Sequence, residues 1–300
     1  GVSTVVPYYE RFLKRFPTIQ DLAASSEEEV IKLWEGLGYY SRARNIRNAA
    51  QLVVEKFSGQ MPDGYEDLRS LPGIGAYSAG AILAIAFRKP RAALDGNLIR
   101  VYSRLFLEER PVDKPEVLRD LWELAESLVP TDPESIRDFT EGVMELGATI
   151  CRPRNPLCPL CPVKSVCQAR KAGVQDRLPL KLKSTQRVKL FESIFWEEKA
   201  GKIRVLKKGT DPKYPHFHRL PFQAEKKKPK GLHLKYSVTH RDFFVGLRLE
   251  KIPTLLKSKS EWIKISDLEV LTFPAIDRKA MKAISLREKP AEYFQEEYKR

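Results

Sequence analysis

Apolar side chains recur every three or four residues through the first half of the chain and alternate with polar ones through much of the second. The first pattern is typical of amphipathic helices and the second of half-buried strands. Helices are predicted over residues 7–16, 26–37, 45–56, 65–70, 76–87, 98–107, 114–128 and 133–150. Strands are predicted over residues 191–197, 202–206, 233–238 and 243–249. We therefore expect a mainly helical part, opened at Pro7, and a smaller α+β part.

A Leu-Pro-Gly-Ile-Gly turn, from Leu71 to Gly75, leads directly into the helix predicted over 76–87. Its glycines, Gly73 and Gly75, let the backbone approach a ligand closely, and the free N–H groups of the first helical turn suit a phosphate. Asp95 follows in a Leu-Asp-Gly-Asn turn after an apolar run, where a carboxylate can face developing positive charge. Each motif alone is commonly only a connection between helices. Their close succession favours a functional site.

The formal charge of +14 and the pI near 9.5 favour a polyanionic partner. Nucleic acid is the leading candidate and an acidic membrane surface the weaker one. In the stretch after Gly38, Tyr39 can wedge between bases while Arg42 and Arg44 neutralise phosphates. The alternative is a helix start with a buried tyrosine and a solvated basic face. No run of about 18 apolar residues and no secretory signal pattern is present, so we expect an intracellular protein that does not enter a membrane.

All four cysteines fall within a single short loop, with the spacing C-x6-C-x2-C-x5-C. Four thiolates this close can hold zinc or a 4Fe-4S cluster, and their chemistry alone does not separate the two. Such a clustered set argues against a scattered disulfide framework. The predicted ligands are Cys151, Cys158, Cys161 and Cys167.

Composition changes after the cysteine loop to a basic run interrupted by prolines, over residues 171–187. This run is predicted to be a solvated linker. We therefore expect a helical domain over residues 1–170, which includes the cysteine loop 151–167, and a second domain over residues 188–300.

The hairpin of Leu71, Gly73 and Gly75, together with Asp95, resembles the helix-hairpin-helix family of DNA glycosylases. The resemblance implies that the hairpin binds the DNA backbone and that Asp95 is the catalytic aspartate. The cysteine spacing is similar to the iron-sulfur loop of the endonuclease III and adenine glycosylase branches, which implies a 4Fe-4S cluster in that loop.

The segment from Gly38 to Arg44 is similar to the adenine-specific branch of the family, which implies that Tyr39 intercalates beside the lesion. Branch members that also cut the backbone carry a lysine where this chain has Tyr77, because an amine can attack the sugar. The resemblance thus implies a monofunctional hydrolase that removes adenine from pairs with 8-oxoguanine or guanine in double-stranded DNA. Tyr77 would line its active site and Asn97 would help to orient water. We expect a monomer in the cytoplasm, associated with the nucleoid.

The second domain resembles a degenerate Nudix-type module, the lesion-recognition domain of adenine glycosylases, and no pyrophosphatase motif is present. Where the family has a Phe-Ser-His loop, this chain has Val238, Thr239 and His240. The resemblance implies that Thr239 and His240 recognise 8-oxoguanine, while the aromatic contact is lost at Val238.

The resemblance places the general-acid glutamate of the family just upstream of the Val-Val-Pro-Tyr-Tyr segment, before Gly1. We expect this chain to be a trimmed version whose activity is impaired. The alternatives are a lesion-binding protein without catalysis and an endonuclease III-like enzyme for oxidised pyrimidines. Tyr77 and the added second domain disfavour the latter.

Overall fold

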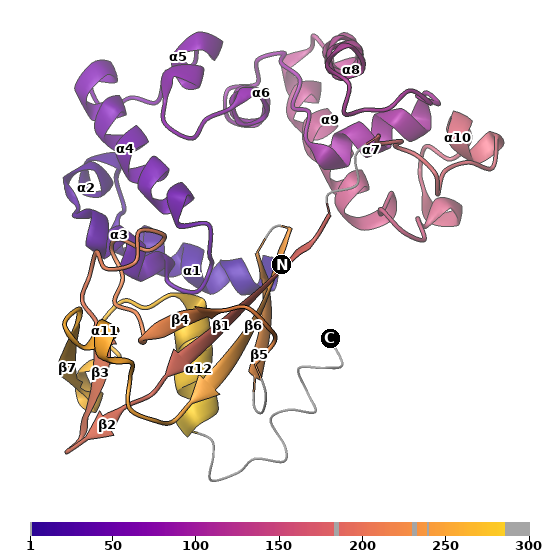
Figure 1. Ribbon diagram of the computed structural model, residues 1–300. Helices are drawn as coiled ribbons and strands as arrows, with labels where there is room; N and C mark the ends of the chain where they lie inside the picture. The colour runs from indigo at the N-terminus through magenta and orange to yellow at the C-terminus, as the bar shows by residue number, and fades with distance from the viewer. Residues whose placement is uncertain (1, 183–185, 230–232, 239, 286–300) are drawn as a thin grey trace. The chain divides into compact units, whose positions relative to one another are not determined.

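The computed structural model describes residues 2–182, 186–229, 233–238 and 240–285 (Figure 1). The chain groups into two compact units: unit 1 combines Gly1–Arg47 with Thr185–Arg300, and unit 2 is Asn48–Ser184. This grouping divides the chain differently from the predicted limits 1–170 and 188–300, because the first helices pack with the second part of the chain.

Unit 2 consists of helices and the cysteine loop (Figure 1). Its elements are the end of α4 (Tyr40–Phe57), α5 (Tyr65–Ser70), α6 (Ala76–Ala86), α7 (Gly96–Leu105), α8 (Pro115–Leu128), α9 (Pro133–Glu145), a π-helical turn (Leu146–Ile150), a 3₁₀ turn (Cys158–Leu160) and α10 (Gln168–Lys171). The core of this unit contains the buried side chains of α7 and α8, among them Leu98, Val101 and Leu121.

Helix α6 is apolar on all sides, as expected of a helix enclosed by its neighbours. Its Gly80 lies against the segment just before Asp95: a Cβ added there would meet the carbonyl oxygen of Ala92. Close packing at this glycine therefore sets the position of the chain that leads into Asp95.

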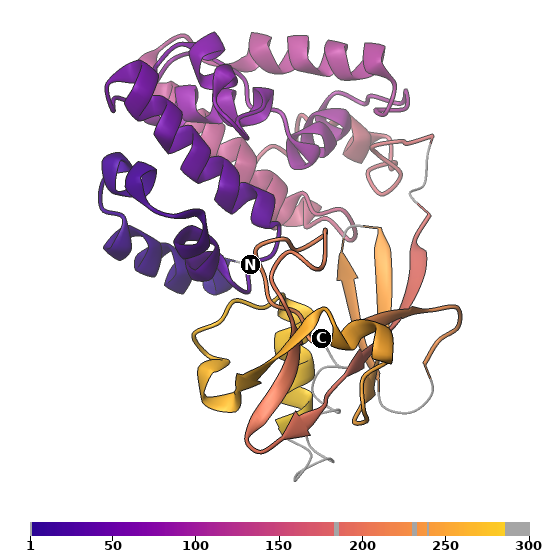
Figure 2. The same cartoon turned by 60° about the vertical axis from the view of Figure 1, so that its left-hand side comes forward.

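Unit 1 begins with α1 (Val2–Arg15), α2 (Ile19–Ala24), α3 (Glu27–Trp34) and the start of α4. The second part of the unit carries a four-stranded sheet, a three-stranded sheet and α12 (Ala275–Ser285), seen from a second direction in Figure 2. The strands are β1 (Val188–Phe195), β2 (Glu198–Lys199), β3 (Lys202–Leu206), β4 (Phe222–Glu225), β5 (His233–Val238), β6 (Arg241–Arg248) and β7 (Ser260–Lys264), with α11 (Thr254–Lys257) and a 3₁₀ turn (Ile265–Asp267) beside β7.

The four-stranded sheet has the order β4-β1-β6-β5, in which β1 and β6 are parallel and the other pairs antiparallel. The three-stranded sheet, β2-β3-β7, is antiparallel. A single core joins both sheets to α12: Ile194 of β1, Ile203 of β3 and Ile276 of α12 are each at most 3% exposed. The predicted α+β character of this part is confirmed.

Helix α3 contacts the segment that precedes α12, which explains why unit 1 combines two distant stretches of the chain. The Lys32 ammonium donates to the carbonyl oxygens of Glu269 and Leu271, each at 2.9 Å. The Arg278 guanidinium donates to Glu35 at 2.6 Å. These partners lie more than 230 residues apart in sequence, so no local pattern could have predicted them.

Several predicted boundaries were wrong. Helix α1 starts at Val2, and Pro7 lies inside it. As the sixth residue of the helix, Pro7 lies beyond the first-turn amides that lack helical partners, so it removes one helical hydrogen bond. The helix predicted to end at 150 changes at Leu146 into a π-helical turn. Strand β4 was missed because its Gln-Ala-Glu sequence is polar. No described helix has the length and apolar character needed to cross a bilayer.

Candidate functional site

The hairpin turn before α6 has the geometry of an anion site. Gly73 adopts a positive φ of 81°, and the Ile74 amide donates to the Leu71 carbonyl at 3.1 Å. At Gly75, which begins α6, no side chain caps the helix, and an added Cβ would meet nothing within 4 Å. The first amides of α6 are therefore available to a phosphate. Leu71, predicted as a DNA contact, is only 2% exposed, so its side chain anchors the turn and its backbone alone can face a ligand.

Asp95 is the N-cap of α7. Its Oδ1 accepts hydrogen bonds from the amides of Asn97 and Leu98 at 2.8 and 2.9 Å. Its Oδ2 accepts a single bond, from the Asn97 side-chain amide at 3.2 Å. The carboxylate is thus held at the N-terminal, positive end of the α7 dipole. One oxygen stabilises the helix, and the other has acceptor capacity for a reacting group.

Tyr77, in the first turn of α6, lies near Asp95. Burial, and then the negative charge of Asp95, raise the pKa of the Tyr77 hydroxyl. The side chain is 37% exposed and makes no hydrogen bond to Asp95 among the described residues. Tyr77 is therefore a neutral hydroxyl beside the carboxylate, accessible to a ligand.

Arg100 continues the line of contacts from Asp95 along α7. Its Nη2 donates to Asn97 Oδ1 at 3.0 Å and to the Gly147 carbonyl at 2.7 Å, and its Nε donates to the Cys151 carbonyl at 2.8 Å. Burial lowers the pKa of this guanidinium, which is only 7% exposed. The side-chain amide of Asn97 is thereby held between Asp95 and Arg100.

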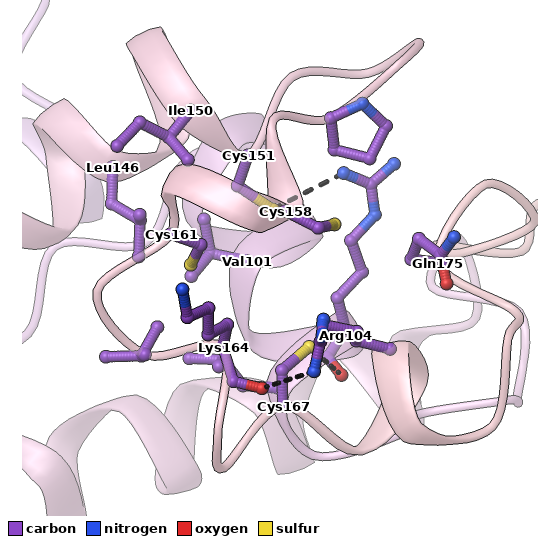
Figure 3. Close-up of a pocket in the computed structure, with 14 residues that line it drawn as sticks. Val101, Arg104, Leu146, Ile150, Cys151, Cys158, Cys161, Lys164, Cys167 and Gln175 are labelled. Carbon is purple, nitrogen blue, oxygen red and sulfur yellow. Dashed lines mark hydrogen bonds between the residues drawn. The ribbon is translucent and has the colours of Figure 1, made fainter.

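The four cysteines line one cavity, together with Val101 and Arg104 of α7 (Figure 3). All four are free thiols, so no disulfide forms within the loop. Burial and the neighbouring thiols raise the pKa values of Cys158 and Cys161. The rest of the lining combines apolar side chains, among them Leu105, Leu146, Ile150 and Val163, with the polar side chains of Arg104, Lys164, Arg170 and Gln175.

The donor set of this cavity fits a metal group bound through sulfur. Four thiols line a common space beside the buried guanidinium of Arg104, whose Nη1 donates to Cys151 Sγ at 3.3 Å. Four such ligands suit either a tetrahedral zinc ion or an iron-sulfur cluster.

Tyr39, which belongs to unit 1, is an exposed aromatic side chain on a strained turn. It is 59% exposed and adopts φ 51°, which a residue with a side chain rarely does. The guanidinium of Arg42 lies over its ring, 5.1 Å from the centroid, and also over Trp34 at 5.9 Å. The turn therefore presents a flat ring supported by a cation, which suits stacking on a nucleic-acid base.

A groove of about 490 Å³ runs beside this turn within unit 1. Tyr39 and Arg44 line it together with Lys213 and Ser237. Its lining is aromatic and basic, as nucleic acid requires. Thr239, predicted to recognise the lesion, lies outside the described residues. His240 lies in the turn between β5 and β6, and its carbonyl accepts from the Val188 amide at 2.8 Å.

Two residues of the site were missed from sequence: Arg100 and Arg104. Both lie on the buried face of α7, where a helical pattern predicts apolar side chains. Their four-residue spacing on a helix that also carries Leu98 and Val101 was the available signal, because those residues define the buried face.

Residues 1–127 match the family model of the HhH-GPD superfamily of base excision DNA repair proteins. The chain is 47% identical over 178 residues to a rat protein named adenine DNA glycosylase, covering 59% of this chain and 34% of the relative. It is 36% identical over 214 residues to the protein of that name from Buchnera aphidicola of Schizaphis graminum, covering 69% and 61%. The solved structure of a thermostable thymine-DNA glycosylase is 31% identical, with a TM-score of 0.50, over 56% of this chain and 76% of the other. The chain thus spans about a third to three fifths of these curated relatives.

Proposed function

We propose that this chain is a member of the HhH-GPD superfamily of base excision DNA repair proteins and that it hydrolyses the N-glycosidic bond of adenine paired with 8-oxoguanine or guanine; the family match over residues 1–127 and the similarity to adenine DNA glycosylases support this. Its partner in this proposal is double-stranded DNA that carries such a mispair. The observation that carries the proposal is the arrangement of Asp95, whose second carboxylate oxygen accepts, among the described residues, only the Asn97 side-chain amide.

Adenine must leave the base stack before its glycosidic bond can break, and the sugar becomes an oxocarbenium-like cation as the base departs. In the proposal, the Asp95 carboxylate stabilises that cation. The α7 amides hold the carboxylate ready, so that no reorganisation is needed when charge develops. Asn97 orients the attacking water, supported by Arg100.

Tyr77 supports hydrolysis without strand cleavage. A lyase needs an amine that forms a Schiff base with the sugar, and a phenol cannot form one. The raised pKa of Tyr77 keeps its hydroxyl protonated, so that it can donate a hydrogen bond to the sugar.

The DNA contacts in the proposal are divided between the two units. In unit 2, the hairpin around Gly73 and Gly75 binds backbone phosphate through amides. In unit 1, Tyr39 stacks on bases while Arg42 and Arg44 neutralise phosphates. Thr239 and His240 recognise the oxidised purine.

The cysteine loop holds a 4Fe-4S cluster in the proposal, with Cys151, Cys158, Cys161 and Cys167 as ligands. Such a cluster, when bound, cross-links the loop and supplies a redox-active centre. Four protein ligands leave no open position for substrate, so the cysteines take no part in hydrolysis. Protonation of the departing adenine is assigned to the family glutamate, which the resemblance places upstream of Gly1.

The test is single-turnover release of adenine from a duplex with adenine opposite 8-oxoguanine, with and without the segment upstream of Gly1. Asp95→Asn retains a side chain that can cap α7 but loses the charge, so release should slow by about 10²- to 10³-fold while duplex affinity stays within a few fold. Asp132→Asn is the matched control, because Asp132 caps α9 through the same kind of bond, to the Ser135 amide at 3.0 Å. Equal rates for both variants would contradict the proposal.

One observation favours a second candidate, a lesion-binding protein without catalysis. The cap that Asp95 provides to α7 would alone account for the aspartate. That candidate predicts tight binding to the mispair and no adenine release from any form of the protein.

A further inference from the structure

Arg104 is a buried cation beside the cysteine cavity. Its side chain lies one helical turn beyond Arg100 on α7, is 2% exposed and is among the largest fully buried side chains of the described chain. Burying a guanidinium is costly unless its charge and its five donors are satisfied. The hydrogen-bond and charge partners of the Arg104 guanidinium therefore indicate its role.

Its donors reach three backbone carbonyls, on two separate stretches of the chain, and the sulfur of Cys151, the last of these bonds being drawn in Figure 3. The acceptors are the Leu178 carbonyl at 3.1 Å from Nε, the Arg152 carbonyl at 2.8 Å and Cys151 Sγ at 3.3 Å from Nη1, and the Pro153 carbonyl at 3.2 Å from Nη2. The backbone carbonyl of Arg104 in turn lies 3.5 Å from Cys167 Sγ. Arg104 thus ties the turn after the first cysteine to the segment that follows the last.

The hydrogen bonds satisfy the donors, but every acceptor is formally neutral. No carboxylate among the described residues forms an ion pair with Arg104 or with Arg100. Arg104 is therefore a buried cation without a carboxylate partner on the wall of a cavity lined by four thiols, which the more exposed Lys164 and Arg170 also line. Thiolates that bind a metal group carry net negative charge, and this is the nearest source of the missing counter-charge.

We propose that Arg104 is the counter-ion and the positioning residue of the metal group bound by the four cysteines. Its charge compensates the negative charge of the metal-thiolate group, and its bond to Cys151 Sγ orients the first ligand. This inference rests on the proposed metal site and extends it to a residue that is not itself a ligand.

Two measurable properties follow. Groups that orient ligands commonly change metal affinity by about 10- to 100-fold. Reduction of an iron-sulfur cluster adds negative charge, which an adjacent cation and a hydrogen bond to sulfur stabilise. Loss of Arg104 should therefore speed metal release and make the reduction potential more negative, whereas a merely structural role would leave the potential unchanged.

The experiment compares Arg104→Met and Arg104→Lys with Arg152→Met in the metal-loaded protein. Arg152 is the matched control: it follows Cys151, is exposed, and within the described part of the chain its side chain donates only to the Asn155 carbonyl, at 3.3 Å. The readouts are iron and sulfide per chain, the rate at which visible absorbance decays in a chelator, and the midpoint potential.

Arg104→Met should release metal at least about tenfold faster and shift the potential downward, while Arg152→Met matches the unmodified protein. Arg104→Lys keeps the charge but loses the planar fork, so its potential should stay near the unmodified value while its release is faster. If Arg104→Met does not fold, the rate of metal release from Arg104→Lys tests the proposal. Unchanged release in the foldable variants would overturn the proposal.

The failure of this inference is distinguishable from that of the proposed function. If the unmodified chain binds zinc and no iron, the proposed cluster is wrong, yet zinc release from the same variants still tests Arg104. If no adenine is released, the proposed reaction is wrong, and the metal measurements keep their meaning.

Discussion

Replacing Gly80 by alanine should damage both the stability of unit 2 and the placement of Asp95. A Cβ at this position would lie 1.8 Å from the carbonyl oxygen of Ala92, 2.8 Å from the Ala92 carbonyl carbon and 3.4 Å from the Ala93 Cα. These are backbone atoms, which cannot rotate aside as a flexible side chain could. To remove the clash, α6 and the segment before Asp95 must separate by more than about 1 Å.

Overpacking of this kind typically costs about 1–3 kcal/mol, and a rigid backbone neighbour places Gly80→Ala at the upper end. The higher helix propensity of alanine returns about 1 kcal/mol. We therefore expect a net loss of about 2 kcal/mol in the free energy of unfolding of unit 2. Gly142→Ala is the matched control, because Gly142 is an exposed glycine within α9 and an added Cβ meets nothing within 4 Å. It should stabilise the unit by about 0.5–1 kcal/mol.

Native-state hydrogen exchange at the amides of α6, α7 and α9 measures these changes without assuming that the whole protein unfolds in one step. Adenine release should slow in Gly80→Ala more than duplex binding weakens, because the displaced segment leads directly into Asp95. Equal protection in the two alanine variants would refute the packing argument. A destabilised Gly80→Ala with normal turnover would refute the link to Asp95.

Three further outcomes are expected. Asp242→Asn should destabilise unit 1 at pH 7, because hydrogen bonds from Arg187 and then Ser237 hold the pKa of Asp242 below its ordinary 3.8. Denaturation over a pH series measures this loss. The difference in stability from the unmodified chain should disappear as pH falls through the lowered pKa, since protonation of Asp242 removes the same contribution. Ser26→Ala should cost about 1 kcal/mol in a urea-denaturation series, since the Ser26 hydroxyl caps α3. Arg100→Met should lower the single-turnover rate of adenine release more than duplex affinity, because it frees the amide of Asn97.

Much of the secondary structure could be predicted because its signals are local. The strand limits predicted over 202–206 and 233–238 coincide with β3 and β5, where apolar and polar residues alternate clearly. Asp95 was singled out by its Leu-Asp-Gly-Asn turn after an apolar run, whereas its role as the N-cap of α7 was not predicted. Such signals depend on neighbours within a few positions, so a single sequence suffices.

The pairing of strands and the grouping of the units could not be predicted in this way. Strand β1 pairs in parallel with β6 about 50 residues later, and Val188 lies opposite Arg241. Strand β4 has no apolar alternation because it is an edge strand with few buried side chains. Contacts such as Glu35 with Arg278 depend on where distant segments meet. Local propensity contains no information about such meetings.

The same distinction, between local signals and contacts of distant segments, applies to the residues of the candidate site. Chemistry-bearing residues with a diagnostic spacing, namely the four cysteines and Asp95, were identified from sequence. Arg100 and Arg104 were not, because a charged residue on a helix is expected to face water unless specific partners compensate its burial. Their partners, the carbonyl groups around Cys151, come about 50 residues later in the chain. Only the folded arrangement reveals that both charges are buried.

Helix α7 explains why these buried charges and the carboxylate belong to one functional unit. With a rise of 1.5 Å per residue, Asp95 and Arg104 lie roughly 14 Å apart along the helix, too far for strong direct electrostatic coupling at physiological salt. A chain of hydrogen bonds connects the two ends more directly. The Asn97 amide donates to Asp95, and Arg100 donates both to Asn97 and to the carbonyl of Cys151. A change in the turn at Cys151 can therefore affect the Asp95 carboxylate through the side chains of Arg100 and Asn97, both on α7. Loss of the metal group should loosen this route, so adenine release should fall with metal content even though the cysteines take no part in the reaction.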